Sequence, residues 1–129
     1  MVRQYRFKTS LGPSIIFMKI PEDAKLLRIF IGENDRWEGK PLFEAIVQKA
    51  RKDGLAGATV LKGFEGFGAH SRIHTAKILR LSEDLPIVIE IVDSEEKIEA
   101  FLPELDEMVK EGLITLEKVR VIKYRCDPG

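Results

Sequence analysis

The sequence predicts an α+β domain with the element order βαββαβ, and three observations support this prediction. Two stretches with helical periodicity each lie between strand-type stretches rich in Ile, Val and Leu. The two halves also share a motif, because KDGLAGATVL at 52–61 and KEGLITLEKV at 110–119 both close a helix and lead into a strand. At 129 residues the chain has the size of one domain with one hydrophobic core. Together these observations indicate the ferredoxin-like fold, a four-stranded antiparallel sheet with both helices on one face.

The first strand, helix, strand unit starts at 26–31 (LLRIFI), a short apolar run that ends in the loop-type stretch GENDRWEGK. Pro41 fits a first helical turn, and apolar residues recur after it at helical spacing. Gly54 is expected to end this helix. The second strand is predicted at 56–62.

The second unit follows a long connection and starts with the clearest strand of the chain, at 85–92. Asp93 or Ser94 is expected to cap the second helix, and Gly112 to end it. The final strand is predicted within 113–124, at 119–124.

The face of the sheet that carries no helix needs a cover of its own. In a chain this short, the usual cover is another subunit, because large apolar surfaces are rarely left exposed. The fold therefore predicts a symmetric oligomer.

Charge and cysteine content exclude several classes of protein. The 21 basic and 21 acidic residues cancel, so nothing draws the chain to nucleic acid or to an anionic membrane surface. Cys126 is the only cysteine, which excludes an intrachain disulfide and a multi-cysteine zinc site and favours a cytoplasmic setting. The longest apolar run is broken by Pro86 and Glu90 and is far shorter than the roughly 20 residues of a membrane helix. We therefore expect no nucleic-acid partner and no membrane insertion.

Residues 1–23 are expected to form an N-terminal tail, and residues 24–126 the folded domain. The apolar patch LGPSIIFM is short, contains proline and lacks a small-residue cleavage pattern, so a signal peptide is not predicted. We hypothesise that Met18, just before the first well-patterned segment, is the natural start. N-terminal sequencing of native protein that begins at Met1 would defeat this hypothesis.

The segment LKGFEGFGAHSRIH at 61–74 is the candidate functional loop. It opens a connection of about twenty residues, and connections of that length in compact domains are usually functional or disordered. Glycines let backbone N–H groups approach a phosphate closely, and basic side chains can neutralise it. The alternative is a flexible turn whose two phenylalanines, Phe64 and Phe67, fold back onto the core. The spacing matches neither a Walker loop nor a Rossmann fingerprint.

Three segments resemble an uncharacterised bacterial and archaeal family that is grouped with the PII signalling proteins. They are GLAGATVLKGFEGFG, SRIHTAKILRLSEDLPIVIEIVD and EAFLPELDEMVKEGLITLEKV, and the resemblance covers residues 24–124. Within it, TVLKGFEGFG is similar to the PII segment in which a strand runs into Lys-Gly-Phe-Gly at the base of the T-loop, and LEKVRVIKY resembles the last PII strand. The resemblance implies a ferredoxin-like trimer that binds ATP or ADP in clefts between subunits and contacts a target protein with its T-loop.

The resemblance also implies which residues contact the nucleotide. Lys123 falls where PII proteins carry a phosphate-binding arginine, whereas Val121 replaces the basic residue before it. The chain departs from the PII pattern at Ala69 and His70, where PII proteins carry Arg-Gln, and it lacks the loop tyrosine that some of them have modified, so uridylylation is not expected. With the basic residues of the loop included, the predicted contacts to an adenine nucleotide are Lys62, Gly63, Phe64, Gly66, Gly68, Arg72, His74 and Lys123.

Other candidate residues have simpler explanations. His70 and His74 are four residues apart and on a helix would point at one metal, and CutA-like relatives of this fold have been linked to metal binding. No third ligand has suitable spacing, so no metal site is predicted. Trp37 would stack on a base or, alternatively, pack against a neighbouring subunit or the helix start. Cys126 has no activating partner and is not expected to be a nucleophile. Three acidic residues after the first strand are expected to be solvated: Glu33, Asp35 and Glu38.

The first functional hypothesis is a non-enzymatic PII-like regulator, a homotrimer that binds an adenine nucleotide and uses the loop at 62–82 to contact a target protein. The alternative is a CutA-like metal-binding protein or a small-molecule enzyme on the same fold, which would need a constellation of acid, base or nucleophile that the sequence does not bring together. RNA binding ranks last, because the strand LPIVIEIV carries no stacking aromatic residue and the net charge is zero.

Overall fold

The computed structural model describes residues 2–9, 12–68, 74–75 and 84–125, and these contain two helices and ten strands. Neither helix combines the length and the hydropathy that crossing a bilayer requires. In chain order the elements are β1 (Val2–Thr9), β2 (Gly12–Pro21), β3 (Asp23–Gly32), β4 (Arg36–Trp37), β5 (Lys40–Pro41), α1 (Leu42–Lys52), β6 (Thr59–Lys62), β7 (Glu65–Gly66), β8 (His74–Thr75), β9 (Pro86–Asp93), α2 (Glu95–Met108) and β10 (Leu113–Arg120).

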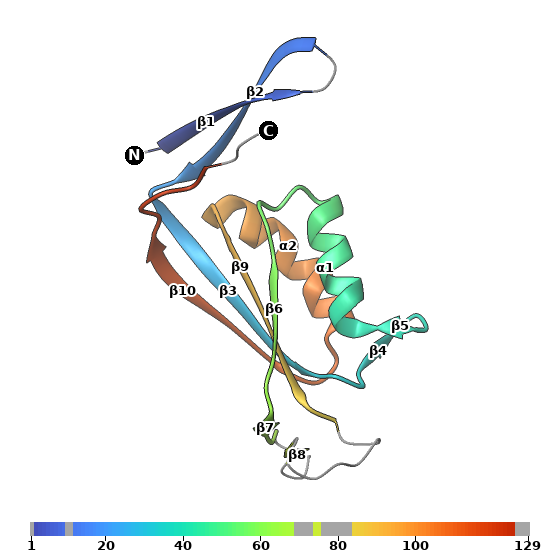
Figure 1. Ribbon diagram of the computed structural model, residues 1–129. Helices are drawn as coiled ribbons and strands as arrows, with labels where there is room; N and C mark the ends of the chain where they lie inside the picture. Colours follow the sequence, from blue (N-terminus) through green and yellow to red (C-terminus); the bar gives the residue numbers. More distant parts are fainter. Residues whose placement is uncertain (1, 10–11, 69–73, 76–83, 126–129) are drawn as a thin grey trace.

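Four strands form one antiparallel sheet in the order β10-β3-β9-β6, and both helices lie on the same face of it (Figure 1). The pairs β4-β5 and β7-β8 are short ribbons outside this sheet. The four strands of this sheet and the two helices follow one another along the chain as strand, helix, strand, strand, helix, strand, which is the ferredoxin-like arrangement. The predicted α+β fold is therefore confirmed.

The core fills the space between the sheet and the helices, and its composition follows from strand alternation. Ile29 of β3 and Ile89 of β9 are directly opposite each other and have no exposed surface. The helices add apolar residues at helical spacing, because only one stripe of each helix faces the sheet. The buried core residues of the sheet and helices are Leu27, Ile29, Ile31, Leu42, Ala45, Ile46, Ala50, Ile87, Ile89, Ile91, Ile98, Phe101, Leu105 and Met108.

A buried carboxylate joins the two halves of the fold at the end of β9. Asp93 is fully buried, and its two oxygens accept hydrogen bonds from the backbone N–H groups of Ala56 (2.9 Å) and Ser94 (2.7 Å). Of the two predicted caps, Ser94 is the one that caps α2, because its hydroxyl accepts from the backbone N–H of Lys97 at 3.2 Å. The second strand was predicted to start at residue 56, but the Ala56 N–H donates to the Asp93 carboxylate, and β6 starts only at Thr59.

The end of α2 and the last strand differ from the sequence prediction. The helix ends at Met108, and β10 occupies Leu113–Arg120 where 119–124 was predicted. The reason is pairing with β3, in which Leu113 lies opposite Phe30. Gly112 does not end the helix but allows this approach, because a Cβ atom there would lie 2.6 Å from the Phe30 carbonyl oxygen.

The N-terminal segment forms a hairpin in which β1 pairs antiparallel with β2, from Val2 opposite Pro21 onward. These strands were not predicted from the sequence. They form a sheet of their own, which projects beyond the end of the four-stranded sheet where β3 begins (Figure 1). The division of the chain into 1–23 and 24–126 stays a prediction.

Candidate functional site

The predicted functional loop leaves and rejoins the four-stranded sheet at the same end. β6 ends at Lys62, which pairs with Ile87, and β9 begins at Pro86, which pairs with Gly32 at the end of β3. The short strands β7 and β8 lie beyond this end of the sheet (Figure 1). We define the loop base as residues 32–35, 62–63 and 84–86.

The turn after β3 holds its own shape. The Asp35 carboxylate accepts a hydrogen bond from the backbone N–H of Gly32 at 3.0 Å, and the Asp35 N–H donates to the Gly32 carbonyl at 3.2 Å. The Asp35 carbonyl in turn accepts from the N–H of Leu42 at 2.8 Å, which ties the turn to the start of α1. Asp35 is therefore a structural residue, and the prediction that it is only solvated is wrong.

Both ends of the loop are fastened to this turn. At the start, the Lys62 ammonium forms an ion pair with the Glu33 carboxylate at 2.5 Å. At the end, the backbone N–H of Glu33 donates to the Leu85 carbonyl at 2.8 Å, and the N–H of Asn34 donates to the Asp84 carboxylate at 2.7 Å. Glu33 thus contacts both ends of the loop, and the prediction that it is only solvated is also wrong.

Two of the predicted glycines pack against Pro86. A Cβ atom at Gly63 would lie 2.7 Å from the Cγ of Pro86, and one at Gly66 would lie 3.1 Å from the same atom. The N–H of Gly63 also donates to the Pro86 carbonyl at 2.8 Å. Glycine is therefore needed at 63 for a close approach within the chain, a role that the sequence did not indicate.

The two phenylalanines of the loop do not fold back onto the core. Phe64 is 67% exposed and Phe67 is 74% exposed, so the alternative explanation of the loop is wrong on this point. In the single chain, both side chains therefore expose most of their apolar surface.

The structure describes the other predicted loop residues only in part. Of His74 the structure describes only the backbone, in β8 opposite Gly66, whereas Arg72 and His70 lie outside the described residues. Gly68 lies two residues after the end of β7. In the part of the chain that the structure describes, no three His, Cys, Asp or Glu side chains come together to hold a metal ion.

Lys123 lies at the opposite end of the sheet from the loop base. It follows β10, whose last residue, Arg120, pairs with Asp23 at the start of β3. The ten residues of β3 span roughly 30 Å, and the loop base lies at the other end of that strand. Lys62 and Lys123 of one chain therefore cannot contact the same small ligand.

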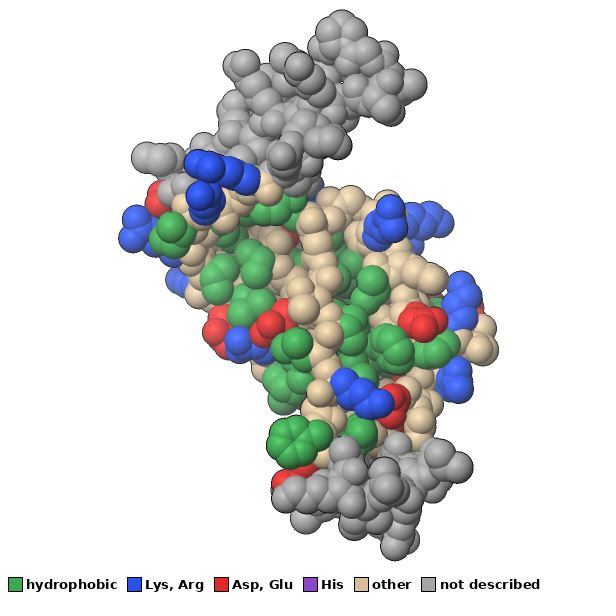
Figure 2. Space-filling view, in the orientation of Figure 1, with side chains coloured by type: hydrophobic (Ala, Val, Ile, Leu, Met, Phe, Trp, Pro, Cys, Tyr) green, Lys and Arg blue, Asp and Glu red, His purple; other side chains and the backbone are tan. Residues whose placement is uncertain are grey.

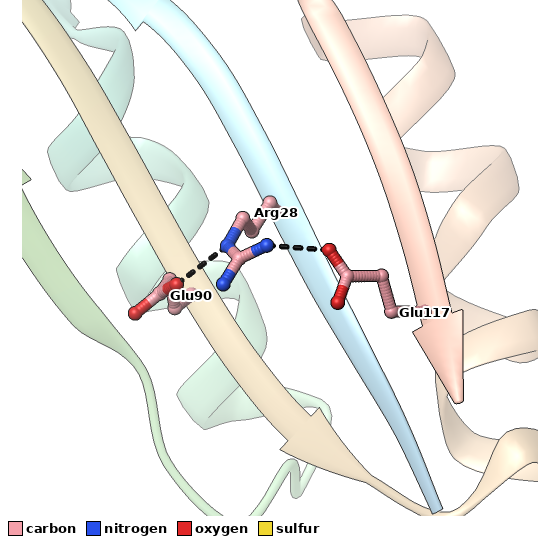
Figure 3. Close-up of polar contacts among 3 residues, drawn as sticks. All are labelled: Arg28, Glu90 and Glu117. Atoms are coloured by element: carbon pink, nitrogen blue, oxygen red, sulfur yellow. Dashed lines mark hydrogen bonds and ion pairs between the residues drawn. The ribbon is translucent and has the colours of Figure 1, made fainter. Parts of the chain in front are cut away.

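The sheet face opposite the helices, which we call the open face, carries a charged group among apolar side chains. Arg28 of β3 bonds to Glu90 of β9 at 2.6 Å and to Glu117 of β10 at 2.5 Å (Figure 3). The hydrogen bond to Glu90 is the main cause that raises the pKa of the Arg28 guanidinium. Figure 2 views the molecule from this side and shows hydrophobic side chains around acidic and basic ones. Exposed apolar residues of this face are Phe30, Leu61, Val92 and Leu113.

A groove of about 420 Å³ lies on the helical side, between α1, α2 and the β4-β5 ribbon. Lys49 lines it and bridges Glu104 of α2 (3.2 Å) and Asp53 (3.5 Å), and the hydrogen bond to Glu104 is the main cause that raises the pKa of Lys49. Trp37 also lines the groove and packs against the core. The sequence analysis missed the pair of Lys49 and Glu104, because no local pattern relates residues of different helices.

Comparison with known proteins identifies the sequence relatives of the chain. Residues 24–121 match the family DUF190 ("Uncharacterized ACR, COG1993"). A UPF0166 protein of Aquifex aeolicus (strain VF5) is 46% identical over 98 residues, which cover 76% of this chain and 92% of that protein. A UPF0166 protein of Methanocaldococcus jannaschii is 41% identical over 101 residues, which cover 78% of this chain and 93% of that protein. The resemblance predicted from the sequence is confirmed.

Solved structures share the fold at lower identity. A putative PII-like signalling protein from Thermus thermophilus has a TM-score of 0.56 and 21% identity, covering 78% of this chain and 90% of its own. CPII from Thiomonas intermedia K12, bound to ADP and bicarbonate, has a TM-score of 0.53 and 20% identity, with the same two coverages of 78% and 90%. CutA from Synechococcus elongatus PCC7942 has a TM-score of 0.52 and 14% identity, covering 88% of this chain and 87% of its own.

Proposed function

The chain belongs to the DUF190 family, and we propose that it is a PII-like regulatory protein that binds an adenine nucleotide at the loop base. The observation that carries this proposal is the position of Lys62, a cation at the first residue of the loop, within a set of contacts that holds both loop ends. A phosphate group bound to Lys62 therefore changes the contacts that hold the start of the loop. Ligand occupancy can then change how the loop is presented, provided that the ligand prefers one loop position.

An adenine nucleotide is the proposed ligand because of the shared fold. CPII has the same ferredoxin-like fold and was solved with ADP and bicarbonate. The group of the loop base that can receive a phosphate is the Lys62 ammonium, which is 52% exposed beside its Glu33 partner. We propose the same ligand class here, at the residues around Lys62 and Gly63.

The proposed site lies between subunits of a homotrimer. Lys62 and Lys123 are at opposite ends of β3 in one chain, so one nucleotide contacts both only if they come from different subunits. The open face supplies the surface for assembly, with exposed apolar side chains around the charged group of Arg28. In a closed ring each subunit gives its loop base to one site and its Lys123 to the next.

The loop at 62–82 is the proposed contact with a target protein in the cytoplasm. Phe64 and Phe67 stand at its start and are 67% and 74% exposed, so they offer an apolar contact that the fold does not use. Aromatic side chains of this kind are enriched at protein interfaces. The proposed role is binding and signal transfer, without catalysis.

Isothermal titration with AMP, ADP, ATP and a cyclic nucleotide, together with light scattering for subunit number, tests this proposal. We expect about one nucleotide per subunit of a trimer. Lys62→Gln and Lys123→Gln should each weaken binding, whereas Lys118→Gln, which removes an exposed cation of β10, should not.

Mixing the two weak variants tests the intersubunit geometry. If Lys62 and Lys123 act across a boundary, trimers mixed from Lys62→Gln and Lys123→Gln subunits contain some sites with both lysines and recover part of the binding. No recovery would contradict the shared site. No binding of any of the four nucleotides by a folded trimer would contradict the nucleotide proposal and leave CutA-like metal binding or an enzymatic role as the alternative.

A further inference from the structure

We infer that Glu33 is an internal competitor for Lys62, so that a phosphate group binds at the loop base by displacing the Glu33 carboxylate. This inference rests on the proposed function. It adds a residue that sets the affinity of the site and connects the ligand to both ends of the loop.

The ion pair between Lys62 and Glu33 reaches across a strand. Lys62 ends β6, Glu33 follows β3, and β9 lies between these two strands in the sheet. Neighbouring strands are about 4.8 Å apart, so the Lys62 side chain and its partner together span roughly 10 Å over the end of β9. The two charged atoms are 2.5 Å apart, and the side chains remain 52% and 30% exposed. The lysine is thus extended toward its carboxylate and is still accessible to a ligand.

The charge of the loop base makes this competition necessary. The base holds three carboxylates, those of Glu33, Asp35 and Asp84, and one cation, Lys62. A phosphate group brings further negative charge and is repelled by each carboxylate that stays in place. Ligand binding therefore requires one of the three to move away.

Glu33 is the carboxylate that can move at least cost. Asp35 and Asp84 accept hydrogen bonds from backbone N–H groups, those of Gly32 and Asn34, and so hold the turn itself. The Glu33 carboxylate is held by the Lys62 side chain, and a phosphate group replaces it directly as the partner of the ammonium. The turn keeps its shape when Glu33 swings away.

Displacement of Glu33 affects the two ends of the loop unequally. The end of the loop stays bonded to the turn through the backbone N–H groups of Glu33 and Asn34. The start loses its side-chain link, because Lys62 then bonds to the ligand. Ligand binding thus removes the side-chain link between the start of the loop and the turn, while the backbone bond from Gly63 to Pro86 and the bonds at the end of the loop stay in place. This change couples the site to the loop.

The test is a double-mutant cycle with the intact chain. ATP, tripolyphosphate and adenosine are titrated into the wild type, Glu33→Gln, Lys62→Gln and the double variant. Glu99→Gln, which removes an exposed acid from α2, controls for the change in net charge. We expect Glu33→Gln to tighten binding of ATP and tripolyphosphate roughly two- to fivefold, the range that a partly exposed ion pair contributes to an equilibrium. Adenosine binding should not change, and the gain should vanish when Lys62 is also replaced.

The outcomes separate this inference from the proposed function. ATP binding that is equal in the wild type and Glu33→Gln overturns the inference and leaves the nucleotide site intact. A gain that persists without Lys62, or that Glu99→Gln reproduces, is a general charge effect and also overturns it. No ATP binding by the folded wild type or by Glu33→Gln overturns the inference, and it overturns the proposed function as well only when AMP, ADP and the cyclic nucleotide also fail to bind.

Discussion

Replacement of Gly63 by alanine tests whether the loop base is closely packed or merely flexible. The added Cβ would lie 2.7 Å from the Cγ of Pro86, whereas ordinary van der Waals contact begins at 3.4 Å, so the neighbour has to shift by several tenths of an ångström. The two backbones cannot simply separate, because the Gly63 N–H donates to the Pro86 carbonyl at 2.8 Å. Overpacking of this kind costs about 1–3 kcal/mol. We expect Gly63→Ala to lower the free energy of unfolding by this amount.

Urea unfolding, followed by circular dichroism at a fixed subunit concentration, measures this loss. Gly57→Ala is the matched control, because nothing lies within 4 Å of a Cβ atom there, and it should leave stability unchanged or raise it by up to about 1 kcal/mol. Pro86→Ala removes the clashing Cγ, so the double variant should recover most of the loss. The reasoning is refuted if Gly63→Ala is as stable as Gly57→Ala, or if Pro86→Ala fails to reduce its cost.

Three further perturbations test other contacts of the fold. Arg28→Met leaves two neighbouring carboxylates without their cation on the open face, so light scattering of a dilution series should show weaker assembly than for Arg120→Met, and equal series would mean that this face is not the interface. Asp93→Ala leaves two backbone N–H donors in a buried site without their acceptor and should cost about 2–4 kcal/mol in urea unfolding; a loss below about 1 kcal/mol would contradict the assigned role. The hydrogen bond to Glu104 raises the pKa of Lys49 above 10.5, so its contribution to stability is fully present below pH 10.5 and is lost as the pH rises above that value. The difference in unfolding free energy between the wild type and Lys49→Met should therefore stay constant up to about pH 10 and shrink as the pH rises toward about 12, and a constant difference over the whole range would argue against this ion pair.

Local sequence patterns were sufficient for the fold, because the core strands and helices carry the periodicity of the elements they form. The alternating isoleucines of β9 and the helical spacing of Leu42, Ile46 and Ala50 identify their buried faces directly. The last strand was misplaced because it lacks such a local pattern. β10 is an edge strand with mostly exposed or half-exposed side chains, so its position depends on pairing with β3 and not on a pattern of its own.

The candidate site was predicted in part, and the missing part consists of contacts between residues distant in sequence. The glycines and Lys62 were recognisable from the segment KGFEGFG. Glu33 was assigned to a solvated loop, because its ion pair with Lys62 depends on the fold. β3 and β6 lie on either side of β9 and finish at the same end of the sheet. The packing of Gly63 against Pro86 was also hidden, since 22 positions separate them along the chain and only the sheet brings them together.

Assembly and ligand binding are inseparable if the proposed site is correct. In the part of the chain that the structure describes, a single subunit offers a phosphate the loop base, in which three carboxylates face one ammonium, and such a surface attracts anions weakly. Lys123 of a neighbouring subunit supplies the second cation, so a ligand that contacts both lysines binds the assembled form more tightly than the separate chains. By linkage, the ligand then strengthens assembly by the same factor. The acidic loop base thus restricts tight binding to the oligomer, in which the 62–82 loops are presented together to a target protein.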